Sequence, residues 1–274
     1  MATENVQSTL RELDALLASM GAASELGVAV SGGVDSLTLA AIAHAAFKQR
    51  VRMYHALSPA VPEEATARVR ELAATHGWRI ELLDAGEFAR QEYRANPLDR
   101  CFYCKTSLYG AIAARTSAQL LSGTNLDDLG EYRPGLRAAS DHGVRHPFVE
   151  VGASKDMVRA LAREMQLGGV AELPAAPCLS SRIETGIAID PRTLALVHAS
   201  ERLVAAAVQA RTVRCRVRAT GVVLELDADA LEAIVAQRRE EIAGEVRAIF
   251  AGAGFKHSVN FAPYRNGSAF VVRK

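Results

Sequence analysis

The chain has 274 residues, which is enough for one large domain or for two smaller domains that each bury a core. Apolar residues make up 49% of it and charged residues 23%, as is ordinary for globular proteins. The 32 basic and 31 acidic residues nearly cancel, which argues against a protein built mainly to coat nucleic acid.

No apolar stretch of the sequence approaches the length of a membrane span. The first residues also lack the basic-then-apolar pattern of a secretory signal peptide, so we expect a cytoplasmic protein. In that compartment cysteines are more often thiols, metal ligands or catalytic groups than structural disulfides. The four cysteines are Cys101, Cys104, Cys178 and Cys215.

The first half of the chain alternates between expected helices and expected strands, after a first helix over residues 7–20. The strands are expected at 28–30, 51–56, 80–83 and 118–124, and the helices between them at 35–48, 62–76 and 102–116. This alternation predicts an α/β fold with a parallel sheet and helices on both of its faces.

The pattern changes after an amphipathic helix at 154–167 and a loop rich in proline and alanine at 172–182. The later elements are a helix at 191–209, strands at 213–218 and 222–227, a long helix at 228–251, and short strands near 255–261 and 268–273. This order predicts a smaller α+β domain. We therefore expect domains over 1–172 and 190–274, joined by a cysteine-bearing loop over 173–189.

A loop rich in hydroxyls and glycine follows the first strand and has the sequence SGGVDS at residues 31–36. Its paired glycines let an anion approach the main chain, and the amides that begin the next helix can hold that anion. Its serines add donors, and Asp35 can hold a divalent cation or order the loop. A turn with a capped helix start is the plainer alternative. We favour a phosphate site, because open α/β sheets bind ligands after the first strand.

The sequence GTNLDD at residues 123–128 follows the fourth strand, at the same expected edge of the sheet. Asp127 and Asp128 could coordinate magnesium on a pyrophosphate, because hard carboxylate ligands suit that ion. They could equally lie in the capped first turn of a helix. Nearby, Arg133 and Arg137 offer guanidinium groups to phosphate or carboxylate.

Three cysteines are candidates for chemistry. Cys101 and Cys104 lie about one helical turn apart and could face one metal or iron–sulfur cluster, form a redox pair, or be soft hydrophobes at a helix start. Cys178 lies in an irregular loop near Arg182, where a cation and backbone amides would favour a nucleophilic thiol; a buried loop cysteine is the alternative. Cys215 alternates with valines in a strand and is expected in the core.

The strand at 213–218 carries Arg214, Arg216 and Arg218 on one expected face, opposite its valines and Cys215. Three guanidinium groups in a row bind anions well. A solvated strand face is the alternative, because alternation predicts exposure of polar residues in any case.

Residues 31–36 resemble the pyrophosphate loop, or PP-loop, of the ATP pyrophosphatases with an adenine nucleotide α-hydrolase-like fold. The resemblance implies that the domain over 1–172 splits ATP to AMP and pyrophosphate while it adenylates a substrate oxygen. It also implies that Asp35 binds Mg²⁺. The ATP-binding residues that the resemblance implies are Ser31, Gly32, Gly33, Asp35, Ser36, Gly123 and Asp128.

The sequence PCLSSRI at residues 177–183, after both loops, resembles the LarE family of ATP-dependent sulfur transferases. These enzymes make pyridinium-3,5-bisthiocarboxylic acid mononucleotide, the organic part of the nickel-pincer cofactor of lactate racemase. The likeness runs through nearly the whole chain, including residues 132–137, 213–218 and 264–268. The order of these pieces is more specific than any one of them.

The resemblance implies that ATP activates a carboxylate of a nicotinate-derived mononucleotide and that a cysteine then displaces AMP. Cys178 occupies the position of that cysteine, which in the best-known members gives up its sulfur and becomes dehydroalanine. Glu201, Arg214 and Arg216 match family positions near the substrate phosphate and a metal site, with Glu201 as the metal ligand, and Arg182 is expected to contact substrate.

Some members carry three cysteines, equivalent to Cys101, Cys104 and Cys178, that are thought to hold a 4Fe-4S cluster. An open iron would then carry a renewable sulfide, and Cys178 would be a cluster ligand. Because all three cysteines are present, we favour this version. The resemblance also implies a homo-oligomer and, as partners, other proteins of nickel-pincer cofactor biosynthesis.

Other classes of function compete with this one. A tRNA-thiolating enzyme can combine the same loop with three cysteines, but the near-zero charge and the lack of an obvious RNA-binding appendage argue against it. An amide-forming synthetase would need no Cys178. A regulator that binds ATP without chemistry would bind the nucleotide, release no pyrophosphate and have dispensable cysteines.

Overall fold

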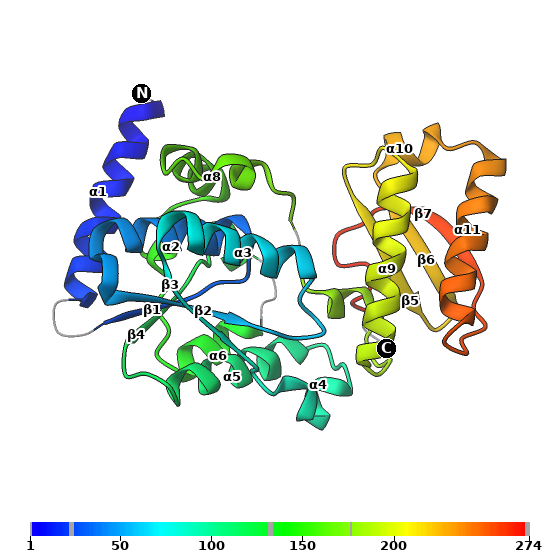
Figure 1. Ribbon diagram of the computed structural model, residues 1–274, viewed down its shortest axis with the longest axis horizontal. Helices are drawn as coiled ribbons and strands as arrows, with labels where there is room; N and C mark the ends of the chain where they lie inside the picture. The colour runs from blue at the N-terminus through cyan, green and yellow to red at the C-terminus, as the bar shows by residue number, and fades with distance from the viewer. Residues whose placement is uncertain (1, 22–24, 131–133, 176, 272–274) are drawn as a thin grey trace. The chain divides into compact units, whose positions relative to one another are not determined.

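The computed structural model describes residues 2–21, 25–130, 134–175 and 177–271 (Figure 1). The chain forms two compact units. The first unit comprises Met1–Arg90 and Cys101–Ala176, and the second comprises Gln91–Arg100 and Pro177–Lys274. Among the described residues, no helix is both long enough and apolar enough to cross a bilayer.

The first unit contains a four-stranded parallel sheet with the strand order β3–β2–β1–β4. The strands are β1 (Leu26–Ala29), β2 (Val51–Ala56), β3 (Arg79–Leu83) and β4 (Gln119–Ser122). In the centre of the sheet, Val28 pairs with Met53 on one side and with Leu121 on the other. Because β1 and β4 are parallel neighbours, the loops that follow them leave the same edge of the sheet. The predicted α/β fold with a parallel sheet is therefore confirmed.

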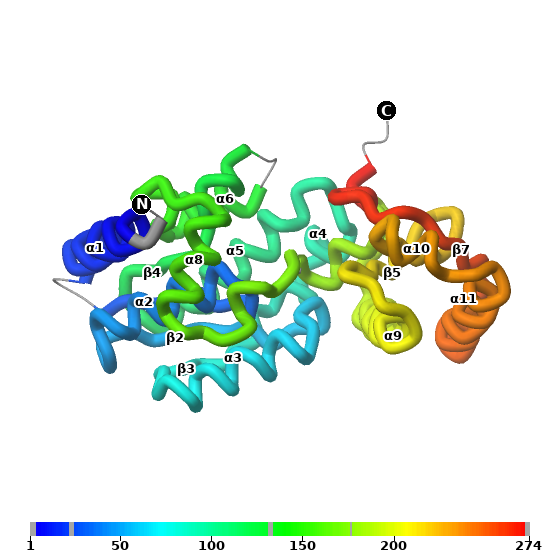
Figure 2. Tube along the Cα trace, turned by 90° about the horizontal axis from the view of Figure 1, so that it is seen from above, coloured from blue at the N-terminus to red at the C-terminus, as the bar shows by residue number. Residues whose placement is uncertain are grey.

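Helices cover both faces of this sheet (Figure 1). One face carries α1 (Ala2–Gly21), α2 (Val34–Phe47), α3 (Glu63–His76) and α8 (Lys155–Glu164), and the other carries α5 (Arg100–Ala113) and α6 (Gly135–Asp141). Each face of the sheet has its own hydrophobic core, and alternate residues of β2 point into the two cores: Met53 packs on the first face and Tyr54 on the second. Helix α2 is apolar on most of its surface because it lies between the sheet, α1 and α8 (Figure 2).

Short helical turns complete the connections between these elements. They are η1 (Lys48–Arg50), η2 (Glu87–Ala89), α4 (Gln91–Arg94), η3 (Leu126–Gly130), α7 (Pro147–Glu150), η4 (Gly168–Glu172) and η5 (Leu179–Arg182).

The second unit contains a three-stranded mixed sheet with the order β5–β6–β7. Its strands are β5 (Val213–Arg218), β6 (Gly221–Leu226) and β7 (Val259–Pro263), and its helices are α9 (Pro191–Ala207), α10 (Ala228–Ala233) and α11 (Ala236–Ala251). β5 and β6 form the predicted antiparallel hairpin. Helix α9 packs against β5 and α11, and α11 also contacts β7.

Two expectations for this unit are wrong. The helix expected over 228–251 is interrupted at Ile234 and Val235, whose backbones are extended. Two adjacent β-branched residues disfavour helix, and the break lets Ile234 reach the core. The final hairpin is also absent from the described residues: β7 pairs in parallel with β6, and residues 264–271 form no strand. The rest of that expected strand, 272–273, lies outside the described residues.

Residues 91–100 fold with the second unit although they interrupt the first in sequence. Asn96, which is buried and has a φ of 54°, donates from Nδ2 to the carbonyl oxygens of Glu184 and Ile187, each at 2.9 Å. Its own Oδ1 accepts from Arg100 at 2.9 Å. Asparagine tolerates this left-handed conformation better than most residues, so one side chain fixes the segment to the loop after Ile183.

Candidate functional site

The loop between β1 and α2 is closed by its own serines. Ser36 Oγ accepts from the Ser31 amide at 3.0 Å and donates to the Gly33 carbonyl at 3.1 Å. Gly32 has a φ of 84°, and a Cβ there would lie 2.7 Å from the Ala65 carbonyl oxygen, so only glycine fits. A Cβ on Gly33 would have 3.6 Å to its nearest neighbour. The loop is therefore fixed on one side, and the first amides of α2 have no partner within their helix.

The loop after β4 meets this loop, as the adjacency of β1 and β4 predicts. A Cβ on Gly123 would lie 2.7 Å from both the Asp35 carbonyl carbon and the Ser36 amide nitrogen. Asn125 Nδ2 also donates to Asp35 Oδ1 at 3.0 Å. The absence of a side chain at Gly123 thus allows the end of β4 to touch the first turn of α2.

Asp35 is paired with Lys155, a residue that the sequence analysis missed. Lys155 Nζ lies 2.7 Å from Asp35 Oδ1 and 2.6 Å from Oδ2. Lys155 begins α8, where Ser154 accepts the capping bond from the Met157 amide. A cation in the first turn of a helix opposes the helix dipole. This unusual position of Lys155 was the feature of the sequence that could have marked it as a functional residue. An ammonium group therefore stands where a cation would bind Asp35.

The two acidic residues after β4 accept backbone hydrogen bonds. Asp128 Oδ2 accepts from the Asn125 amide, and Asp127 Oδ2 from the Lys155 amide, both at 3.1 Å. These contacts match the capping alternative, and the magnesium role of the pair stays a prediction. Of the two nearby arginines, Arg133 lies outside the described residues, and the Arg137 guanidinium lies 3.9 Å from the centre of the Phe102 ring.

His55, at the end of β2, is a second residue that the sequence analysis did not single out. Its Nδ1 lies 2.9 Å from the Val30 carbonyl oxygen, and its Nε2 lies 2.9 Å from Thr66 Oγ1. Because a carbonyl only accepts, Nδ1 carries the proton and Nε2 accepts from Thr66. Burial lowers the pKa of His55, more than the bond to Val30 raises it. A neutral imidazole thus ties β2 to the start of the loop between β1 and α2.

The candidate cysteines belong to different units. Cys101 and Cys104 lie in the first turns of α5, half-buried, in the first unit, whereas Cys178 belongs to the second. Within each unit taken by itself, the described residues include no group of three His, Cys, Asp or Glu side chains arranged to hold a metal ion. The three-cysteine ligand set therefore stays a prediction.

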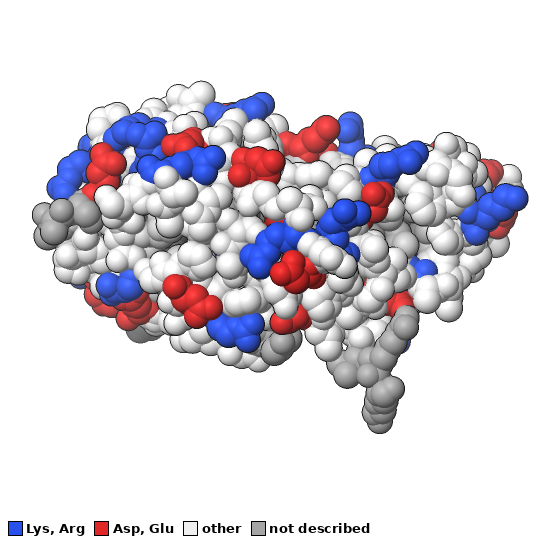
Figure 3. Space-filling view, turned by 90° about the horizontal axis from the view of Figure 1, so that it is seen from below, with Lys and Arg blue, Asp and Glu red and all other residues white. Residues whose placement is uncertain are grey.

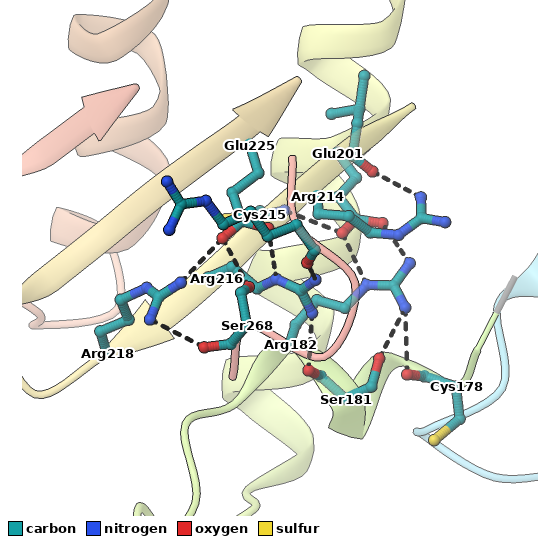
Figure 4. Close-up of polar contacts among 12 residues, drawn as sticks. Cys178, Ser181, Arg182, Glu201, Arg214, Cys215, Arg216, Arg218, Glu225 and Ser268 are labelled. Atoms are coloured by element: carbon teal, nitrogen blue, oxygen red, sulfur yellow. Dashed lines mark hydrogen bonds and ion pairs between the residues drawn. The ribbon is translucent and has the colours of Figure 1, made fainter. Parts of the chain in front are cut away.

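In the second unit, Arg182 joins the Cys178 loop to α9 and β5 (Figure 4). Its Nε and Nη2 donate to the two carboxylate oxygens of Glu201 at 2.8 and 3.1 Å. Its Nη1 donates to the Pro177 carbonyl at 2.6 Å and to the Cys178 carbonyl at 3.2 Å. Glu201 Oε1 also accepts from the Cys215 amide at 2.9 Å.

A second buried ion pair lies beside the first (Figure 4). Arg216 donates from Nε to Glu225 at 3.0 Å and from Nη1 to the Ser181 carbonyl at 2.9 Å. Arg218 and the Ser268 hydroxyl donate to the other Glu225 oxygen at 2.8 and 2.6 Å. Burial alone would raise the pKa of Glu225, but the Ser268 hydrogen bond and the guanidinium groups hold it below its ordinary value.

Both sides of β5 are covered, so the alternative of a solvated arginine face does not hold. The side chain of Arg216 is 4% exposed, because the residues around Ser181 and Ser268 lie over it. On the opposite side Cys215 is fully buried, which raises the pKa of its thiol and confirms it as a core residue. The alternation of arginine with apolar residues along β5 predicted which face of the strand is polar, but it could not predict that the chain around Ser181 and Ser268 covers that face.

Arg214 lies at the edge of this group, with its guanidinium 5.8 Å from the centre of the Tyr264 ring. Burial and the neighbouring Arg182 guanidinium lower its pKa. We call these residues the arginine cluster: Arg182, Arg214, Arg216, Arg218, Glu201 and Glu225. Four guanidinium groups meet two carboxylates, so the cluster has a surplus of two positive charges.

The outer surface shows no comparable concentration of charge on the face drawn in Figure 3, where basic and acidic side chains of the described residues are interspersed.

No family model matches the chain. The uncharacterized protein slr1717 of Synechocystis is 34% identical over 202 residues, which cover 72% of this chain and 71% of that protein. The uncharacterized protein MJ0830 of Methanocaldococcus jannaschii is 25% identical over 244 residues, or 87% of this chain and 90% of that protein.

A distant relative of this chain has a named activity. The pyridinium-3,5-bisthiocarboxylic acid mononucleotide synthase of Lactiplantibacillus plantarum is 29% identical over 192 residues, which cover 68% of this chain and 69% of the synthase. The identity and coverage are higher for the Synechocystis protein. On that similarity, the chain belongs to the same family as the uncharacterized protein slr1717 of Synechocystis.

Proposed function

We propose that the protein is an ATP-dependent sulfurtransferase that converts the carboxylates of pyridinium-3,5-biscarboxylic acid mononucleotide to thiocarboxylates. The observation that carries this proposal is the Cys178 loop, which Arg182 and Arg216 hold inside a cluster with surplus positive charge. The similarity to the synthase and the loop between β1 and α2 support the same assignment.

In the first half-reaction, the loop between β1 and α2 (residues 31–36) binds ATP together with Gly123 and Asp128. A substrate carboxylate oxygen attacks the α-phosphorus, and pyrophosphate leaves, which makes an acyl-adenylate. This activation is needed because a free carboxylate resists nucleophiles. Asp35 would hold a magnesium ion in place of the Lys155 ammonium, because this ion pair is partly exposed (30% and 25%) and can exchange, unlike the Arg182–Glu201 pair, in which the arginine is 4% exposed. The bound ion would neutralise charge on the leaving pyrophosphate.

In the second half-reaction, the arginine cluster binds the phosphate of the mononucleotide. A phosphate monoester carries a charge of about −1.5 to −2 at pH 7, which matches the surplus of two positive charges. Arg214 is the residue that we expect to touch it, because it lies at the edge of the cluster beside Tyr264, whereas the Arg216 side chain is 4% exposed. Glu201 does not fit the role of metal ligand that the sequence analysis expected, because both of its carboxylate oxygens accept hydrogen bonds from Arg182. We derive no step through a metal there.

The sulfur comes from one of two sources. Cys101, Cys104 and Cys178 would hold a 4Fe-4S cluster, whose open iron would supply sulfide when the cluster is bound. These three thiols suit the iron atoms of such a cluster, and two of them, Cys101 and Cys104, lie one turn apart on α5. In the alternative, the Cys178 thiolate attacks the acyl-adenylate carbonyl and AMP leaves. A base then removes the Cα proton of Cys178, the Cα=Cβ double bond forms, and the Cβ–S bond breaks, which releases the thiocarboxylate and leaves dehydroalanine.

The intact mass of the protein, before and after incubation with ATP and the biscarboxylated mononucleotide, tests the proposal. Pyrophosphate should form only when both substrates are present, and a thiocarboxylate product should appear. A mass loss of one H₂S at Cys178 would identify the sacrificial route. Iron and acid-labile sulfide in anaerobically purified protein, with no mass loss, would identify the cluster. Cys178→Ser should retain pyrophosphate release and lose the product. Absence of both pyrophosphate and product in the wild type would refute the proposal.

A further inference from the structure

The guanidinium of Arg182 is almost fully used inside the protein. Two of its nitrogens bind Glu201, and Nη1 donates to the Pro177 and Cys178 carbonyl oxygens and to the Ser181 hydroxyl. Of the five N–H donors of arginine, only the second one on Nη2 is left for a substrate, because the two on Nη1 are shared among three acceptors. The side chain is also only 4% exposed. Direct contact with substrate, which the sequence analysis expected of Arg182, has little room in this arrangement.

Glu201 fixes the other edge of this guanidinium. It belongs to α9, and its Oε1 also accepts from the amide of Cys215 on β5. The carboxylate is therefore anchored to both the helix and the sheet, which are the rigid parts of this unit. A planar guanidinium held at two points by Glu201 has one orientation left, and that orientation places Nη1 at the two carbonyls.

The main chain after Cys178 has further anchors, whereas described residues before it are exposed. Tyr93 and the Ser180 hydroxyl are 2.6 Å apart, and Arg216 holds the Ser181 carbonyl at 2.9 Å. On the other side Pro174, Ala175 and Pro177 are exposed. The two bonds from Arg182 therefore lie where the fixed part of the loop meets its exposed part, directly at Cys178.

We propose that Arg182 is a positioning residue that acts with Glu201 to hold the main chain at Cys178, and that it is not a substrate ligand. This inference rests on the proposed function, in which Cys178 either delivers sulfur or binds the group that delivers it. Both versions need the sulfur atom of Cys178 at a fixed place, because misplacement of a reacting group by about 1 Å can cost roughly 100-fold in rate.

Four variants of the full-length protein test this inference: Arg182→Gln, Arg182→Lys, Glu201→Gln and the double variant Arg182→Gln/Glu201→Gln. Arg211→Gln is the matched control, because Arg211 pairs with Asp229 on the surface, where the two side chains are 79% and 86% exposed. Three quantities are measured for each variant: the Kd of the mononucleotide, the rate of sulfur transfer, and hydrogen exchange of the amides at 178–183.

Arg182→Lys, which keeps the positive charge of the cluster, should lower sulfur transfer by roughly 100-fold and leave the Kd of the mononucleotide within about twofold of the wild type. Exchange at 178–183 should rise roughly tenfold, because the carbonyl anchors are lost. Arg182→Gln should resemble Arg182→Lys in sulfur transfer and in exchange, because neither side chain can bridge a carboxylate and two carbonyls. Its Kd also reports the loss of one positive charge from the cluster. The double variant should be no worse than Arg182→Gln, because both residues act through one contact. Arg211→Gln should match the wild type in all three measurements.

A tenfold weaker Kd for Arg182→Lys with unchanged loop exchange would overturn the inference and restore Arg182 as a substrate ligand. Additive losses in the double variant would overturn the link to Glu201. If Arg182→Gln does not fold, Glu201→Gln, which keeps the size of the side chain, carries the same test. If the wild type shows no sulfur transfer, the proposed function fails, but the exchange measurement still decides whether Arg182 holds the loop.

Discussion

Replacement of Glu225 by Gln is the most direct test of the charge balance in the second unit. The Glu225 carboxylate is 2% exposed and accepts bonds from Arg216, Arg218 and Ser268. Glutamine has nearly the same size and keeps one oxygen acceptor, so the packing should survive. What the variant removes is the negative charge that compensates two guanidinium groups.

The expected cost follows from the burial of Arg216. Its side chain is 4% exposed, so it cannot turn to water, whereas Arg218 at 22% exposure can do so in part. Removal of one partner from a buried pair costs about 3–5 kcal/mol, because the other charge stays buried without compensation. Since Ser181 and Arg265 still accept bonds from Arg216, we expect the lower end, about 3 kcal/mol.

Urea unfolding followed by two probes measures this cost. Trp78 is the single tryptophan of the chain and lies in the first unit, so its fluorescence reports that unit, while far-ultraviolet circular dichroism reports both. We expect Glu225→Gln to move the dichroism transition to lower urea. Asp229→Asn, which removes the exposed partner of Arg211, should leave both transitions unchanged. A destabilisation by Glu225→Gln below about 1 kcal/mol would refute the reasoning, because so small a value is typical of exposed pairs.

The same pair predicts a pH dependence. The pKa of Glu225 lies below its ordinary value of 4.5 in the folded protein, since the Ser268 bond and the guanidinium groups outweigh the opposing effect of burial. A carboxyl with a lowered folded pKa contributes stability above pH 4.5, and this contribution is lost as the pH falls through the folded value. The difference between wild type and Glu225→Gln should therefore shrink below pH 4.5, and a difference that grows would contradict the assignment.

Three further predictions concern the first unit. Gly123→Ala should abolish ATP binding in calorimetry, because its Cβ would lie 2.7 Å from backbone atoms of α2. Gly33→Ala should fold normally, because its Cβ would have 3.6 Å to the nearest neighbour. It should lose ATP binding only if the phosphate of ATP occupies the space next to Gly33. Lys155→Gln should weaken ATP binding roughly tenfold in the absence of magnesium, because Asp35 would then repel the phosphates; unchanged affinity would count against this role. Burial lowers the pKa of His55 below 6.5, so the neutral ring stabilises the fold above pH 6.5 and this contribution is lost as the pH falls. The urea midpoint of His55→Gln should consequently fall less steeply with acid than that of the wild type, and equal slopes would contradict the prediction.

The parallel sheet could be predicted because its evidence is local. Each strand is a short apolar run between turn residues, and β2 lies at the expected residues 51–56. Likewise, helix α9 begins after Asp190, which caps it, with Pro191 in the first turn. The contact between Gly123 and the loop between β1 and α2 could be predicted as well, because β1 and β4 are adjacent parallel strands whose following loops leave the same edge of the sheet.

The partners of the charged residues could not be predicted, because they are set by packing between distant segments. Lys155 lies 120 residues from Asp35, and no spacing rule relates them. The pairing of Arg216 with Glu225 depends on the register between β5 and β6, and the burial of both depends on the chain around Ser268. A pattern that assigns arginines to one face of a strand therefore says nothing about whether they meet a ligand or a carboxylate.

The two buried ion pairs of the arginine cluster are not explained by stability alone. A buried arginine–glutamate pair contributes no more than well-packed apolar residues of similar volume, because desolvation offsets the attraction. An apolar contact, however, has no direction, whereas a guanidinium fork fixes the oxygens that it binds. The forks of Arg182 and Arg216 end on the carbonyls of Pro177, Cys178 and Ser181, all in one loop. Selection for the position of that loop accounts for these pairs where selection for stability does not, and under the proposed function the sulfur atom of Cys178 needs such a fixed position.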